Sequence, residues 1–138
     1  MLDEDRGKIR YLNRYKQPIS YEGMMRRRKI TPTDIDGLID YHGNCFIYIE
    51  GKGVGAPIEY GQRKALENLV DSHVKAGHPA CAVIFRHTSD SDSIVIAKDQ
   101  RVDLIYHNKQ WRPPVAPMTV LQFIERWESY HESQNVKL

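Results

Sequence analysis

Apolar and polar side chains alternate with a period of two through residues 34–52, DIDGLIDYHGNCFIYIEGK. Odd-numbered positions in this stretch are almost all apolar or small, whereas every charged residue occupies an even-numbered position. Side chains in a β-strand point alternately to its two faces. The pattern therefore predicts a β-hairpin with one apolar core face and a second face that carries the charges.

The turn of this hairpin determines which charged residues meet across it. An odd-length turn centred on Gly43 keeps the two faces in phase, and glycine accepts the unusual backbone angles of such a turn. In this register Asp36 lies across from Glu50 and Asp34 lies across from Lys52.

Two carboxylates about 5 Å apart repel by roughly 3 kcal/mol at an effective dielectric constant near 20. A divalent cation such as Mg²⁺ or Mn²⁺ would relieve this repulsion, because both ions prefer hard oxygen ligands. The alternative is a solvated sheet face, on which Asp34, Asp36 and Asp40 only keep an edge strand soluble.

The hydrophobic pattern of the remaining chain predicts an α/β domain with a central mixed sheet flanked by helices. The continuous apolar run ACAVIF indicates a central strand covered on both sides. Thr119 followed by Gln122 marks the start of the last helix as a capping box. The expected helices cover residues 20–28, 59–76 and 118–130, and the further strands cover residues 80–85, 93–97 and 102–107.

Composition and charge refine this picture. A chain of 138 residues is long enough for one domain with a core and short for two. The net charge is only +2, but residues 1–29 hold nine Lys and Arg against four Asp and Glu. We expect residues 1–18 to form a basic, partly ordered arm. The run Arg26, Arg27, Arg28 and Lys29 would suit a polyanion, or it is a solvated arm.

The two cysteines, Cys45 and Cys81, both lie in apolar, strand-like segments. We therefore expect buried thiols rather than a disulfide or a zinc site, as in a reducing cytoplasm. The sequence shows neither a signal peptide nor an apolar run long enough to cross a bilayer. The glycine-rich segment 51–55 lacks the spacing and the ending of a P-loop.

The order of these chemical groups resembles the PD-(D/E)XK nuclease superfamily. Asp36 precedes an apolar strand that ends in Glu50-Gly51-Lys52, and Gln62 follows early in the next helix. The resemblance covers roughly residues 20–87, and PTDIDGLIDYHGNCFIYIEGK looks like the small phage-type and Holliday-junction-resolvase-like members. It implies a restriction-endonuclease-like fold.

The resemblance also implies roles for the residues that match. Asp36 and Glu50 would hold one or two Mg²⁺ or Mn²⁺ ions, with the Gly51 carbonyl as a further ligand, and Lys52 would orient or deprotonate the attacking water. Gln62 would position a phosphate, a water or the lysine.

Two assignments stay open within the resemblance. Glu22 would be an additional acid that reaches the metal through water, or it is only an acid at the start of a helix. Pro32 precedes Asp34 by two residues and Asp36 by four, so the superfamily label does not decide between these aspartates. Asp36 is preferred because it faces Glu50, and Asp34 is the second choice.

The sequence thus predicts a metal-dependent endonuclease that hydrolyses DNA, with branched or structured duplex DNA as substrate in recombination or packaging. One active site per short chain would require a homodimer to cut two strands. The basic run from Arg26 to Lys29 would bind DNA. The alternatives are a catalytically inactive nucleic-acid-binding module and a phage-encoded interaction or inhibitor protein.

Overall fold

The computed structural model describes residues 17–88 and 93–138 of the chain. The chain divides into two compact units, Met1–Pro32 and Thr33–Leu138. All but the last two residues of the expected basic arm, residues 1–18, lie outside the described residues.

The helix expected over residues 20–28 is absent from the N-terminal unit. The Ser20 hydroxyl does accept a hydrogen bond from the Glu22 amide at 3.2 Å, but this contact caps a turn rather than a helix. Gly23 follows with a φ of 81°, which is incompatible with a continuing right-handed helix. The regular element found here is the single 3₁₀ turn η1 (Arg27–Lys29), in which Arg28 has a φ of 57°.

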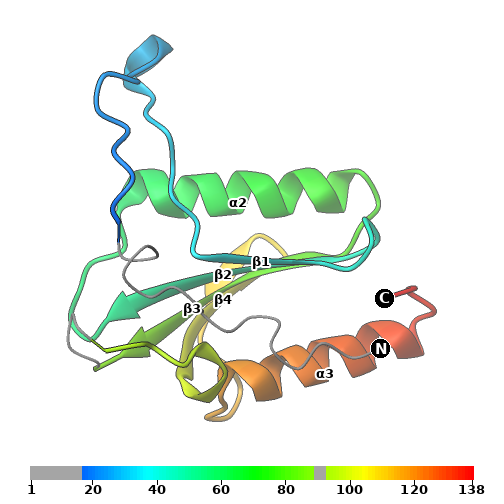
Figure 1. Cartoon of the computed structure of the whole chain (residues 1–138). Helices are drawn as coiled ribbons and strands as arrows, with labels where there is room; N and C mark the ends of the chain where they lie inside the picture. The colour runs from blue at the N-terminus through cyan, green and yellow to red at the C-terminus, as the bar shows by residue number, and fades with distance from the viewer. Residues whose placement is uncertain (1–16, 89–92) are drawn as a thin grey trace. The chain divides into compact units, whose positions relative to one another are not determined.

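The C-terminal unit is built on a five-stranded mixed sheet, which confirms the expected α/β class. The strands are β1 (Gly37–Asp40), β2 (Phe46–Gly53), β3 (Ala80–His87), β4 (Arg101–His107) and β5 (Gln110–Arg112), and they lie in this order across the sheet. The pair β2–β3 is parallel, and the other three pairs are antiparallel. Helices α2 (Tyr60–Lys75) and α3 (Val120–Ser133) lie on opposite faces of the sheet (Figure 1).

The register of the first hairpin is the one that the sequence predicts. Gly37 pairs with Ile49 and Leu38 pairs with Tyr48, so the next opposed positions are Asp36 and Glu50. Gly43 adopts a φ of 79° in the turn, as expected of the residue at its centre.

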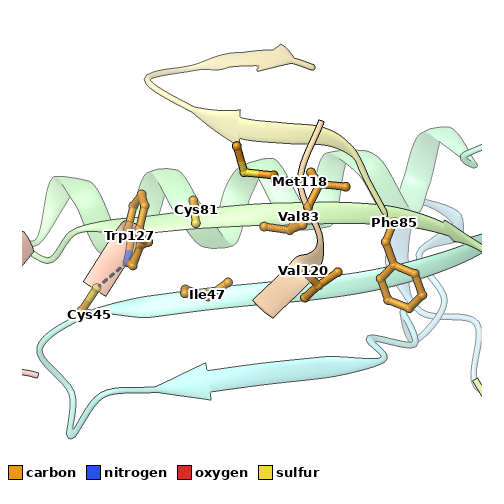
Figure 2. Packing of buried hydrophobic residues seen from close by; sticks show 9 residues of the cluster. Cys45, Ile47, Cys81, Val83, Phe85, Met118, Val120 and Trp127 are labelled. Carbon is orange, nitrogen blue, oxygen red and sulfur yellow. Dashed lines mark hydrogen bonds between the residues drawn. The ribbon is translucent and has the colours of Figure 1, made fainter. Parts of the chain in front are cut away.

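Each face of the sheet packs against one helix. The odd-numbered side chains of β2 and β3 form a core with Val120 and Trp127 of α3, shown in Figure 2. In this core the Trp127 indole N–H donates to the Cys45 sulfur at 3.1 Å, and both Cys45 and Cys81 are buried free thiols, as predicted.

The even-numbered face is covered as well, by Leu66 and Val70 of α2. Tyr48 and Glu50 are both buried on this face. Glu50 is therefore shielded from solvent, whereas Asp34, Asp36 and Asp40, the acids of the solvated-face alternative, are exposed.

The helices expected over residues 59–76 and 118–130 and the strands over 80–85 and 102–107 are confirmed, and α3 begins with the predicted capping box. The strand expected at residues 93–97 is wrong. This segment leads into the 3₁₀ turn η2 (Ala97–Asp99) instead. The central strand β3 already pairs with β2 and β4 on its two edges, so it offers no free edge to a further strand. Val95 and Ala97 still pack against the core beneath α3.

Within residues 17–88 and 93–138, no helix combines the length and the apolar character needed to cross a membrane.

Candidate functional site

Asp36 and Glu50 meet at the end of the first hairpin. The Asp36 amide donates to Glu50 Oε2 at 3.4 Å, and the Gly51 amide donates to Asp36 Oδ2 at 2.8 Å. The Asp36 side chain therefore reaches across to β2, beside the Glu50 carboxylate. Glu50 is only 3% exposed, whereas Asp36 is exposed. The predicted pair of acids thus has one buried member and one member open to solvent.

Helix α2 contributes Gln62 to the same site. Its side-chain N–H group donates to Glu50 Oε1 at 2.7 Å and to the Asp34 carbonyl at 3.2 Å. Gln62 lies one turn before Leu66, which is fully buried against the sheet, so the packing of α2 directs Gln62 inward. The Gln62 Oε1 atom is buried and has no hydrogen-bond partner among the described residues. It is an acceptor available to a donor that a substrate, a water or a neighbouring side chain would supply.

The electrostatics of the pair follow from this burial. Desolvation is the largest cause that raises the pKa of Glu50 from 4.5 to about 7, and the neighbouring Asp36 charge is the second. A hydrogen bond between the two carboxyls also raises this pKa, whereas Lys52 and the Asp36 amide oppose the rise. Near pH 7 the Glu50 carboxyl is therefore only partly ionised, and a bound cation would favour its ionised form.

Lys52 lies on the same strand face as Glu50, two residues further along β2. It is half-buried, and in the parallel ladder it stands beside Arg86 of β3. The Arg86 guanidinium donates to Asp103 Oδ2 at 3.0 Å, to the Gly53 carbonyl at 3.1 Å and to the Ala56 carbonyl. Arg86 therefore holds the connection that leads from β2 to α2.

Arg86 is absent from the sequence-based set of site residues. The alternation of side chains along β3 could have identified it. Arg86 follows an apolar run and lies on the same face of the sheet as the even-numbered residues of β2.

Gly51 separates the acid from the lysine and packs closely on the other face of the sheet. A Cβ atom at this position would lie 2.5 Å from the Phe85 Cζ atom, and Phe85 is buried. Two adjacent strands can bring a large ring over position 51 only if that position has no side chain.

We expect Gly51→Ala to lower the free energy of unfolding by about 1–3 kcal/mol, because the added methyl group overpacks the core beneath Phe85. Urea denaturation would measure the loss. Gly53→Ala is the matched control, since a Cβ atom there meets nothing within 4 Å. Equal stability of the two variants would contradict the proposed contact.

The structure brings together five of the predicted site residues, namely Asp36, Glu50, Gly51, Lys52 and Gln62. Asp34, the second choice for the metal position, contributes its backbone carbonyl to Gln62. Glu22 and the run from Arg26 to Lys29 belong to the N-terminal unit, where they are exposed. Their predicted roles stay predictions.

The donor atoms of this site suit a hard divalent cation. Among the described residues no group of three or more His, Cys, Asp or Glu side chains is arranged so that it could hold a metal ion, so the site offers two carboxylates. Mg²⁺ is commonly held by one or two carboxylates and keeps several of its waters. Asp36, Glu50 and the unpartnered Gln62 Oε1 supply oxygen atoms of the right kind for such an ion and its waters.

No protein-family model, curated protein or solved structure matches this chain. Function is therefore inferred from the geometry and chemistry of the site itself.

Proposed function

We propose that this protein is a Mg²⁺- or Mn²⁺-dependent nuclease that hydrolyses phosphodiester bonds in DNA. The observation that carries the proposal is the contact between Asp36 and Glu50, whose pKa is raised to about 7 first by burial and second by the neighbouring Asp36 charge. The fold holds two carboxyls side by side, one of them buried. A bound cation would stabilise this arrangement. The order β1, β2, α2, β3 supports the resemblance to a restriction-endonuclease-like core.

Each residue of the site has a role in this chemistry. Asp36 and Glu50 would hold the cation, which when bound polarises the scissile phosphate and lowers the pKa of a water. Lys52 would orient the attacking water and offset charge that develops on the phosphate. Gln62 fixes the direction of the Glu50 carboxylate through its hydrogen bond to Oε1. The Gly51 carbonyl stays a candidate ligand.

The substrate and the assembly are part of the same proposal. We favour branched or structured duplex DNA, which rests on the resemblance to small resolvase-like nucleases. Arg26, Arg27, Arg28 and Lys29 form an exposed basic run that would contact DNA phosphates. A homodimer would supply the two sites needed to cut both strands.

We expect the purified protein to cleave plasmid or four-way-junction DNA with Mg²⁺ or Mn²⁺ and to lose this activity in EDTA. Asp36→Asn should remove the activity, because the exposed amide keeps the shape of the side chain but loses its charge. Asp99→Asn, an exposed aspartate in η2, is the matched control and should cleave like the parent.

The outcome separates the alternatives. A parent protein that cleaves neither DNA with either ion would exclude the nuclease. Activity that survives Asp36→Asn and disappears in Asp34→Asn would move the metal position to Asp34.

A further inference from the structure

A cavity of about 550 Å³ lies between the β4–β5 hairpin and α3. Its lining includes Ile105 and Trp127, which belong to the core on the odd-numbered face of the sheet. Glu50 lies on the even-numbered face with Gln62 of α2, so the cavity and the acidic pair are on opposite faces. None of the residues proposed for the nuclease site lines the cavity.

The sequence explains why the core is open here. Strand β5 ends at Arg112, and Pro113 and Pro114 follow, neither of which has a backbone N–H for a further strand pairing. The chain then leaves the sheet and returns at Met118, which is buried. Figure 2 shows Met118 and Trp127 at the packed centre of the α3 layer. Beyond that centre, no part of residues 17–88 or 93–138 fills the cavity at this edge of the sheet.

The charges around the cavity are all of one sign. Arg112 and Arg126 belong to its lining, and the lining contains no Asp or Glu. Both arginines are exposed, and neither guanidinium has an ion-pair or hydrogen-bond partner in the described part of the chain. Two unpaired guanidinium groups at a cavity without carboxylates complement an anion.

The interior of the cavity is aromatic. Along α3 the rings of Phe123, Trp127 and Tyr130 belong to the lining, and Tyr130 is 58% exposed. The His131 ring lies 4.2 Å from that of Trp127, and its buried Nε2 atom has no partner among the described residues. Flat apolar surfaces with few polar atoms, in a volume of this size, are typical of sites for small ligands with rings.

We propose that this cavity binds a small aromatic anion, with its ring against the α3 side chains and its anionic group paired with Arg112 and Arg126. This proposal is independent of the nuclease. A nucleotide combines the two required features, either as a free mononucleotide or as the phosphorylated end of a strand.

A titration of the full chain followed by amide NMR shifts would test the site. The probes are AMP, 1-anilinonaphthalene-8-sulfonate and a 5′-phosphorylated tetranucleotide, beside adenosine and inorganic phosphate, which each carry only one of the two features. We expect AMP or the sulfonate to shift the amides of Arg112, Val115 and α3, with at least about tenfold higher affinity than adenosine or phosphate. Tighter binding of the tetranucleotide than of AMP would identify a strand end as the source.

Two variants distinguish this site from general attraction to a basic protein. Arg126→Gln should weaken binding about tenfold, as should Val115→Glu, which places a carboxylate at a fully exposed lining position. Arg101→Gln makes the same charge change at an exposed arginine outside the lining and should have no effect. Absence of shifts at the lining with every probe, or equal weakening by Arg101→Gln, would overturn the proposal.

Discussion

Lys52→Ala is expected to slow DNA cleavage by about 10²- to 10⁴-fold while Mg²⁺ affinity stays unchanged or rises. The carboxylates alone are enough to hold a cation, but hydrolysis also needs a group beside the attacking water. Lys52 is half-buried on the face of Glu50, and its positive charge already lowers the pKa of that carboxyl. Its removal takes a positive charge away from the cation and an orienting group away from the water.

Calorimetric Mg²⁺ titration and single-turnover cleavage on the same preparations would separate the two effects. Lys75→Ala, an exposed lysine in the last turn of α2, is the matched control. If Lys52→Ala cleaves as fast as the parent while Asp36→Asn is inactive, the acids still bind metal but the role given to Lys52 is wrong. Loss of metal binding in Lys52→Ala would instead mean that the lysine is needed to maintain the structure of the metal site.

The second large effect concerns stability without metal. Glu50→Gln should raise the free energy of unfolding by about 3 kcal/mol at pH 8 and leave it nearly unchanged at pH 4. The folded-state pKa of Glu50 is about 7, above the ordinary value of 4.5, so the native state favours the protonated carboxyl. This contribution is complete below pH 4.5 and is lost as the pH rises to about 7. Glutamine stays neutral and can still accept the hydrogen bond from Gln62.

Urea denaturation in EDTA at both pH values would measure this difference, with Glu125→Gln as the exposed control on α3. Adding Mg²⁺ at pH 8 should restore the stability of the parent and have a smaller effect on Glu50→Gln, because a ligand that binds only the folded state stabilises it. Parallel pH profiles of parent and Glu50→Gln would contradict the buried, charge-coupled state of Glu50.

The contact between Asp36 and Glu50 could be predicted because it depends on local rules. The alternation of side chains identified the faces, and the turn at Gly43 fixed the register. The inward direction of Gln62 followed from its spacing to Leu66. The burial of Glu50 could not be read from the same pattern, because it depends on where α2 packs.

Two of the errors arose where distant parts of the chain determine the structure, and one arose from the conformation of a single glycine. Residues 93–97 have strand-like alternation but find no free strand edge beside β3. The segment 20–28 contains residues that can start a helix, yet Gly23 takes a left-handed conformation within it. Arg86 was missed because its partners Gly53, Ala56 and Asp103 come from two other segments.

The order of the strands in the sheet has a consequence for how the molecule assembles. Each strand pairs with its neighbour in the sequence, and a single crossover, through α2, is needed. Short chain closures cost less entropy and favour rapid folding. The hydrogen bonds among Asp36, Glu50, Gly51 and Gln62 all form within one hairpin and the first turn of the helix after it. The hydrogen bonds of the polar site therefore use no residue of α3, and a substitution that lines the α3 cavity removes none of them.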